Sequence, residues 1–293
     1  TAVGSVVAPT TLLTALLFYF GWLHAQAMLR YFRVQLTVFD FTLQDYLVRS
    51  ADGLFLPVTI AAAVALVFLW VNRFLLGGAT TLWRAKVLRI LAPVTGVAGI
   101  ALMALALAAA LGNHQVFGTF PEGGGLSLSV GVLLLAYTAR LARRVVADRP
   151  PGRASSTPTP GVLAAEWGAV FILVSVGLFW AVNSYALGVG TGRAQQIERE
   201  LASAPDVVLY SEKSLDLQVI GVRELVCSDP AALTEAAFRY RYEGLKFVLR
   251  SGNQLLFLPA GWTRDAGNAL VIPRTDGMRL EFTGPRRGVA SRC

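Results

Sequence analysis

Long apolar runs dominate the first two thirds of the chain, and the longest lies between residues 167 and 192. It holds no charged side chain before Arg193. A helix of this length, rising about 1.5 Å per residue, crosses a hydrocarbon layer of roughly 30 Å. Four earlier runs have the same character, so the pattern predicts five transmembrane helices, over residues 9–29, 53–72, 90–111, 124–140 and 167–190.

The segment between the first two runs is too polar to span a membrane. In residues 34–53 the apolar side chains of Phe39, Leu43, Tyr46 and Leu47 fall at helical spacing among charged ones. This pattern is typical of a short amphipathic helix in the membrane interface, and it predicts one over about 39–52. Its apolar face would lie on lipid or on a neighbouring subunit.

After Arg193 the apolar pattern changes from helical spacing to alternation. Short runs rich in Val, Leu, Phe and Tyr are separated by Gly, Asn, Asp and Pro, with Gly-containing turns at 251–253 and 275–277 and a helix expected at 230–237. We therefore predict an α-helical polytopic membrane protein (residues 1–192) carrying a C-terminal α+β, strand-rich extracytoplasmic domain (193–293), with a small barrel as one form. A charged helical stalk would join the two.

Composition supports a membrane protein. Hydrophobic residues make up 55% and charged residues 15% of the chain, and mean hydropathy is +0.56, whereas about a quarter of residues are charged in soluble domains. Lysine supplies only three of the 26 basic residues, which indicates a GC-rich, bacterial genome. The first apolar run is too long for a cleaved signal peptide, so we expect it to remain as a helix in a bacterial plasma membrane.

Basic residues gather in two of the connections between spans. Four lie between the second and third spans, none between the third and fourth, and five between the fourth and fifth. The positive-inside rule then puts the N-terminus in the cytoplasm and the C-terminal domain outside. The net charge of +8 therefore reflects topology, and nucleic acid is not expected as a partner.

The two cysteines of the chain, Cys227 and Cys293, both fall in the domain that charge places outside. Disulfides persist there, so a bond between them is predicted, with two unpaired thiols as the alternative.

The sequence offers no convincing catalytic site. Residues 193–293 contain no histidine, which excludes Ser-His-Asp, Cys-His and His-ligated zinc sites from that domain. No phosphate-binding GxxxxGK[ST] motif occurs, and no GxGxxG follows a strand. The predicted spans carry no central charged residue, which disfavours coupled transport. We expect neither enzymatic activity nor a cofactor nor a metal site.

Two classes of function remain. The first is a homo-oligomeric channel with an extracytoplasmic gating or ligand-binding domain. Its candidate pore-lining residues are the polar ones of the fifth and first spans, Asn183, Ser184, Ser175, Gln26 and His24. The alternative role for these side chains is hydrogen bonding near the membrane interface.

The second class is a membrane-anchored accessory or binding protein, whose domain at 193–293 docks on a membrane complex or an extracellular ligand. Its candidate contact surface is basic and consists of Arg239, Arg241, Lys246 and Arg250. An ordinary solvated strand face is the alternative.

Self-association is expected, and a strict monomer would favour the second class over the channel. The third span is rich in small residues, including Gly96 and Gly99, which allow another helix to approach closely. We expect it to be the helix most surrounded by protein.

Overall fold

The structure is a computed structural model, which describes residues 2–77, 81–112, 117–118, 120, 122–147, 159–227 and 238–284. The chain divides into two compact units. The first comprises Thr1–Gly21 and Ser50–Ala186, and the second Trp22–Arg49 and Leu187–Cys293. The second unit thus takes in Trp22–Arg49, which the sequence prediction assigned to the membrane part.

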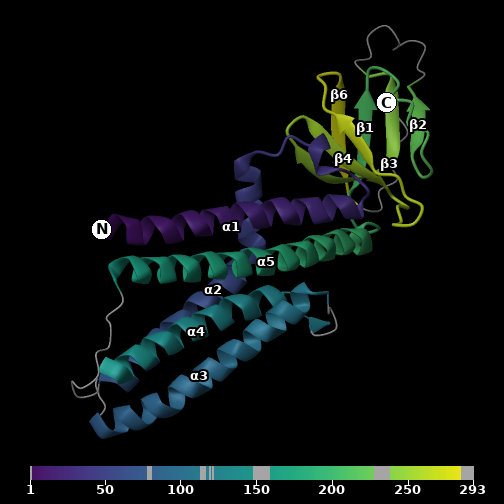
Figure 1. Ribbon diagram of the computed structural model, residues 1–293. Coiled ribbons are helices and arrows are strands. Elements are labelled where there is room, and N and C mark those ends of the chain that lie inside the picture. Colours follow the sequence, from purple (N-terminus) through teal and green to yellow (C-terminus); the bar gives the residue numbers. More distant parts are fainter. Residues whose placement is uncertain are drawn as a thin grey trace. The chain divides into compact units, whose positions relative to one another are not determined.

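The described residues form five long helices and one short 3-10 turn (Figure 1). These are α1 (Ala2–Tyr31), η1 (Leu36–Val38), α2 (Leu43–Gly77), α3 (Thr81–Ala110), α4 (Gly123–Ala147) and α5 (Pro160–Glu200). Four helices, α1, α3, α4 and α5, contain stretches long and apolar enough to cross a membrane. The apolar stretch of α2 is shorter, Pro57–Val71. The prediction of a helical membrane protein with a strand-rich domain is confirmed at this level.

Helix α2 differs from the prediction. An interfacial helix followed by a separate span was expected, but one helix runs from Leu43 to Gly77 with Pro57 inside it. A capping box starts it, because the backbone N–H of Thr42 donates to Oδ2 of Asp45 (2.8 Å) and the N–H of Asp45 donates to Oγ1 of Thr42 (3.3 Å). The carboxylate of Asp45 accepts hydrogen bonds from the backbone N–H and from the hydroxyl of Thr42 (2.9 Å), and these two bonds lower the pKa of Asp45.

In the first unit, α3 packs closely on α4. A Cβ added at Gly99 would lie 2.9 Å from Leu135 and 3.2 Å from the backbone oxygen of Gly131, and the hydroxyls of Thr95 and Thr138 are 2.8 Å apart. The small residues of the third span therefore serve contact within the chain. The expectation that this span is the most surrounded by protein is wrong, since 11% of its apolar window is buried against 44% for that of α1.

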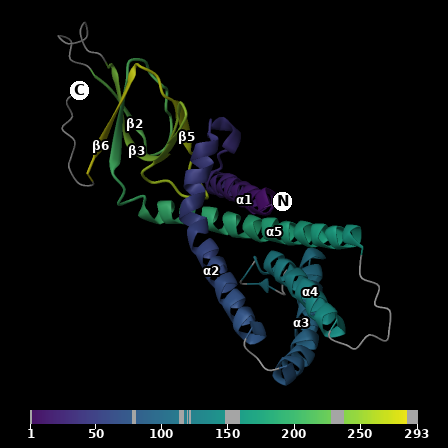
Figure 2. The same cartoon turned by 90° about the vertical axis from the view of Figure 1, so that its left-hand side faces the viewer.

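The second unit contains a six-stranded antiparallel sheet (Figure 2). Its strands are β1 (Asp206–Ser211), β2 (Arg223–Val226), β3 (Tyr240–Ser251), β4 (Gln254–Pro259), β5 (Leu270–Pro273) and β6 (Met278–Thr283). Their order is β5-β4-β3-β1-β6, and β2 pairs with β3. Among the described residues β5 and β6 are not paired, so the sheet is open and does not close into the barrel that we considered.

The two predicted turns have different outcomes. Residues 251–253 join the paired strands β3 and β4, as expected of a hairpin. Residues 275–277 join β5 to β6, which lie at opposite ends of the sheet order and are not a hairpin. The helix expected at 230–237 lies outside the described residues.

Strand β3 is the longest of the sheet, and a glycine inside it lets it continue from Tyr240 to Ser251. Gly244 has φ +84°, a left-handed value that side chains disfavour. An added Cβ would also lie 2.1 Å from the backbone oxygen of Gly221. The strand therefore passes through an irregularity that glycine permits.

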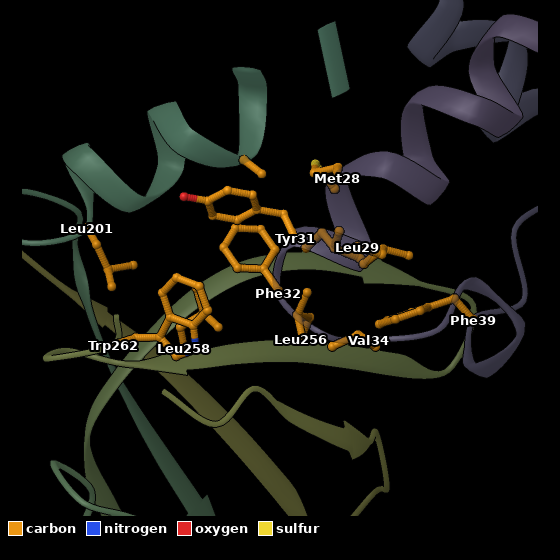
Figure 3. Close-up of a cluster of buried hydrophobic side chains, with 12 residues drawn as sticks. Met28, Leu29, Tyr31, Phe32, Val34, Phe39, Leu201, Leu256, Leu258 and Trp262 are labelled. Carbon is orange, nitrogen blue, oxygen red and sulfur yellow. The ribbon is translucent and has the colours of Figure 1, made fainter. Parts of the chain in front are cut away.

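Two apolar cores hold the second unit together. One, built on the sheet, contains Val207, Leu209, Tyr242, Leu245, Leu255, Phe257 and Ile272. The other, here called the helix-end core, joins the sheet to the ends of α1 and α5 and to the segment between α1 and α2 (Figure 3). It contains Met28, Leu29, Tyr31, Phe32, Val34, Phe39, Ala194, Leu201, Leu249, Leu256, Leu258 and Trp262.

Strand β4 explains why the sheet needs both cores. Its successive residues Leu255 to Leu258 are all apolar and almost completely buried. Alternate side chains point to opposite faces, so Leu255 and Phe257 enter the sheet core while Leu256 and Leu258 enter the helix-end core. A strand that is apolar on both faces has to be covered from both sides, and the second cover comes from the helix ends.

Candidate functional site

The candidate pore-lining residues are divided between the two units. Ser175, Asn183 and Ser184 belong to the first unit, whereas His24 and Gln26 belong to the second. Asn183 is half-buried, and its Oδ1 accepts a long hydrogen bond of 3.4 Å from the hydroxyl of Tyr19 in α1. Tyr19 is a partner that sequence reasoning missed, since no local pattern connects positions 164 residues apart.

The serines of α5 face protein rather than open space. The Oγ of Ser175 is buried and has no hydrogen-bond partner in the part of the chain that the structure describes. Ser184 is half-buried. Nearby, Ser129 of α4 donates to the backbone oxygen of Val174 (3.2 Å), a contact that joins α4 to α5. Hydroxyl groups in these helices therefore serve helix packing.

A second polar contact in the first unit compensates for the proline in α2. Pro57 has no N–H, so the carbonyl of Gly53, four residues earlier, lacks its helical donor. The hydroxyl of Tyr185 in α5 donates to that carbonyl at 3.2 Å. A Cβ added at Gly53 would lie 2.3 Å from the ring of Phe20, so the close approach of α1 requires glycine there.

The glycines in the second half of α5 do not interrupt it. Gly188, Gly190 and Gly192 lie within a helix that continues throughout Pro160–Glu200. A Cβ at Gly190 would lie 2.5 Å from the backbone oxygen of His24 and 2.8 Å from Ala27. Gly190 thus allows α1 and α5 to pack closely within the second unit.

The four basic residues proposed as a contact surface do not share one exposed face. Arg239 and Arg250 are exposed, whereas Arg241 and Lys246 are 1% and 3% exposed. Both buried cations are paired, Arg241 with Glu243 at 2.6 Å and Lys246 with Asp206 at 2.9 Å. Arg241 is covered because its strand β3 has β1 on one side and β2 on the other at this position, whereas Arg239 precedes the strand and Arg250 lies near its exposed end beside the turn at 251–253.

Tyr210 stands between two arginines on the same face of the sheet. The guanidinium carbons of Arg241 and Arg279 lie 5.8 and 5.3 Å from its ring centroid. Burial raises the pKa of Tyr210, and the hydrogen bond from Arg279 lowers the pKa of Glu281. Each arginine also has a carboxylate partner, Glu243 or Glu281, so this face balances its own charge.

A further polar cluster, here called the helix-end cluster, lies where α1 and α5 end. It consists of Tyr31, Arg33, Glu198, Arg199 and Arg264. The hydroxyl of Tyr31 donates to Glu198, whose Oε1 accepts the backbone N–H of Arg264 at 3.3 Å. The guanidinium carbon of Arg264 lies 4.8 Å from the ring centroid of Tyr31. Three segments of the chain are thereby joined through one carboxylate.

Arg33 enters this cluster through an uncommon backbone conformation. Its φ of 62° is in the left-handed region, where the residue closes the end of α1 through bonds from its own N–H to Arg30 and from Val34 N–H to Leu29, both 3.0 Å. Glycine is the usual residue there, and a side chain costs about 1 kcal/mol. The side chain of Arg33 donates to the backbone oxygen of Asp265 at 3.3 Å.

Two further expectations concern metals and disulfides. Within the described ranges no three His, Cys, Asp or Glu residues gather as a metal site would require. Cys227 is buried, but Cys293 lies outside the described residues, so the disulfide stays a prediction.

Comparison with known proteins finds no protein-family model, no curated protein sequence and no solved structure that matches this chain. A function is therefore inferred from the geometry described above.

Proposed function

We propose that this chain is a membrane-anchored binding protein of a bacterial plasma membrane, whose sheet domain docks on a membrane complex or an extracellular ligand. The helix-end core is the observation that carries this proposal. Leu256 and Leu258 of the sheet share that core with Tyr31 of α1 and Ala194 of α5. A domain attached at several points is a fixed platform, which costs less entropy to present to a partner than a domain on a flexible tether.

Five spans are supported by a parity argument. Phe39 of the α1–α2 segment and Leu256 of the sheet belong to one core, so both segments lie on the same side of a membrane. An even number of crossings must therefore separate them. Helices α3, α4 and α5 meet the criteria for spanning, and three is odd, so α2 supplies the fourth crossing despite its short apolar stretch.

The positive-inside rule then favours an external sheet domain and a cytoplasmic N-terminus. Labelling of Cys293 with a membrane-impermeant thiol reagent tests this orientation in intact cells after mild reduction. Modification is expected without permeabilisation, and modification only after permeabilisation contradicts the orientation.

The docking proposal is tested by photo-crosslinking in native membranes. Ile220, which is 98% exposed in the segment between β1 and β2, is a suitable position for the photoreactive residue. We expect one discrete adduct with a different protein, identified by mass spectrometry and absent when the same residue replaces exposed Asp276. If adducts form equally at both positions, or form only with lipid, the docking proposal fails.

The homo-oligomeric channel remains the second candidate, favoured by the continuity of α5. This helix extends from Pro160 to Glu200, and Ala194 near its end is part of the helix-end core. Movement of the sheet domain would reach α5 directly. Bilayer recording with Asn183→Leu tests conduction, and mass measurement in detergent tests self-association; a monomer without conductance excludes the channel.

A further inference from the structure

The helix-end cluster contains three arginines that no other part of the described chain neutralises. Arg33, Arg199 and Arg264 are all exposed, and among the residues that the structure describes none of them forms an ion pair. In the same unit the buried cations Arg241 and Lys246 each have a carboxylate partner. The three exposed guanidinium groups are therefore available to an external anion.

Two carboxylates at the end of α5, Glu198 and Glu200, accept hydrogen bonds from other groups. Glu198 accepts the hydroxyl of Tyr31 and the backbone N–H of Arg264, and Glu200 accepts the side-chain amide of Gln196 at 2.9 Å. Arg199 follows Glu198 in α5 and is exposed. Arg264 lies over the ring of Tyr31 and Arg33 reaches the residue after Arg264, so positive charge from separate segments meets beside Tyr31.

Arg264 is held in place before any ligand arrives. Its backbone is fixed by Glu198, and its guanidinium lies over the ring of Tyr31. Stacking uses the face of the guanidinium, which leaves the N–H donors at its edge available for the oxygens of a phosphate. A preorganised side chain loses less entropy on binding than a mobile one.

Arg33 is also held in place, by its backbone conformation and by one hydrogen bond of its guanidinium. Its left-handed backbone is a local strain of the kind that collects at functional positions. One N–H of its guanidinium reaches the carbonyl of Asp265, the residue after Arg264. Arg33 and Arg264 are therefore brought to the same short segment.

The position along the helix identifies the source of the anion. The apolar stretch of α1 ends at Tyr31, and a helix that crosses a membrane with this stretch would carry the cluster to the depth of the headgroups. The anions concentrated at that depth are the phosphates of lipids. We propose that Arg33, Arg199 and Arg264 form a binding site for the headgroup of an anionic phospholipid.

The test uses the full chain, purified in a neutral detergent, with bound lipid counted by native mass spectrometry. The probes are dihexanoyl phosphatidylglycerol, dihexanoyl phosphatidylcholine and glycerol 3-phosphate. We expect phosphatidylglycerol to bind about tenfold more tightly than phosphatidylcholine, as one or two charge-assisted hydrogen bonds allow. The Arg33→Gln, Arg264→Gln double variant should lose this preference.

A control matched in charge separates a site from general attraction. Arg223 and Arg274 are exposed arginines of the sheet strands and their connections, and changing both to Gln removes the same charge. The preference for phosphatidylglycerol should persist in this control. If both double variants lose the preference for phosphatidylglycerol equally, the proposal is overturned. It is also overturned if glycerol 3-phosphate binds as tightly as phosphatidylglycerol, because that would indicate a soluble ligand.

A conservative variant covers the case in which the double variant does not fold. Arg264→Lys keeps the charge but not the planar pair of donors. We expect it to retain the thermal midpoint of the wild type and to bind phosphatidylglycerol several-fold more weakly. If Arg264→Lys binds phosphatidylglycerol as tightly as the wild type, the planar pair of guanidinium donors has no role in binding.

Discussion

The contact between Tyr185 and Gly53 makes a prediction that can be tested with a double-mutant cycle. Tyr185→Phe removes the hydroxyl that donates to the Gly53 carbonyl, while it keeps the ring that lies 5.9 Å from that of Phe20. In the wild type this carbonyl has no helical donor because of Pro57, so loss of the Tyr185 hydroxyl leaves a backbone acceptor unsatisfied. Interhelical hydrogen bonds in membranes contribute about 0.6 kcal/mol on average and about 1.7 kcal/mol at most.

The second mutation restores the missing donor from within α2. Pro57→Ala supplies an N–H to the Gly53 carbonyl, so Tyr185→Phe should cost much less in that background. We expect a coupling energy of about 0.5–1 kcal/mol between the two positions. In thermal unfolding in detergent, Tyr185→Phe should lower the midpoint by about 2 °C more in the wild type than in the Pro57→Ala background.

A matched control is available in the same unit. Tyr19→Phe removes a hydroxyl that donates to Asn183 and not to α2, so its effect should be the same in the wild type and in the Pro57→Ala background. If Tyr185→Phe also costs the same in both backgrounds, the compensation of Pro57 by Tyr185 is refuted. If Pro57→Ala alone unfolds the protein, Pro57→Ser provides the same N–H with less helix propensity.

Three other predictions concern the second unit and its attachment. Gly190→Leu should separate α1 from α5 and lower the thermal midpoint by several degrees, whereas Gly188→Leu, where an added Cβ meets nothing within 4 Å, should not. Asp206→Asn should destabilise the sheet by about 2 kcal/mol because the buried Lys246 ammonium loses its carboxylate partner, and Lys246→Met in the same chain should recover part of this in chemical denaturation. The pKa of Asp45 is lower in the folded than in the unfolded protein, so its cap stabilises α2 above the unfolded pKa, and this stabilisation is lost as pH falls through the folded pKa. Amide exchange at residues 42–46, corrected for intrinsic rates, should therefore accelerate in that pH range. Asp45→Asn should abolish this pH dependence.

Much of the helical part was predictable because apolar length is a local property. The spans predicted at 9–29, 90–111 and 167–190 reappear in the apolar stretches Thr10–Tyr31 of α1, Ile90–Ala110 of α3 and Gly161–Glu200 of α5. The start of α2 was also written locally, in Thr42 and Asp45, but the polar composition of residues 34–53 was interpreted as a separate helix. Nothing local shows that Pro57 lies in the interior of a long helix, where a hydroxyl from a distant helix compensates for its missing N–H.

The composition of the second unit was less predictable because it depends on long-range contacts. The run Leu255–Leu258 is apolar at every position, and this was a usable signal that β4 is covered on both faces. Nothing local indicates that the cover comes from Phe32 and Tyr31. The burial of Arg241 likewise follows from its central place in the sheet, which the charge pattern of one strand does not reveal.

The helix-end core also determines the order in which the protein is completed during synthesis. Phe32, Val34 and Phe39 leave the ribosome early, but Leu258, which covers them, follows about 220 residues later. At about 5–20 residues per second this interval is on the order of ten to forty seconds. During it the apolar side chains after α1 have no sheet to pack against, and they are open to lipid, to a chaperone or to a protease. A chain whose synthesis stops before β4 therefore keeps the apolar side chains after α1 uncovered, because the sheet residues of the helix-end core have not been made.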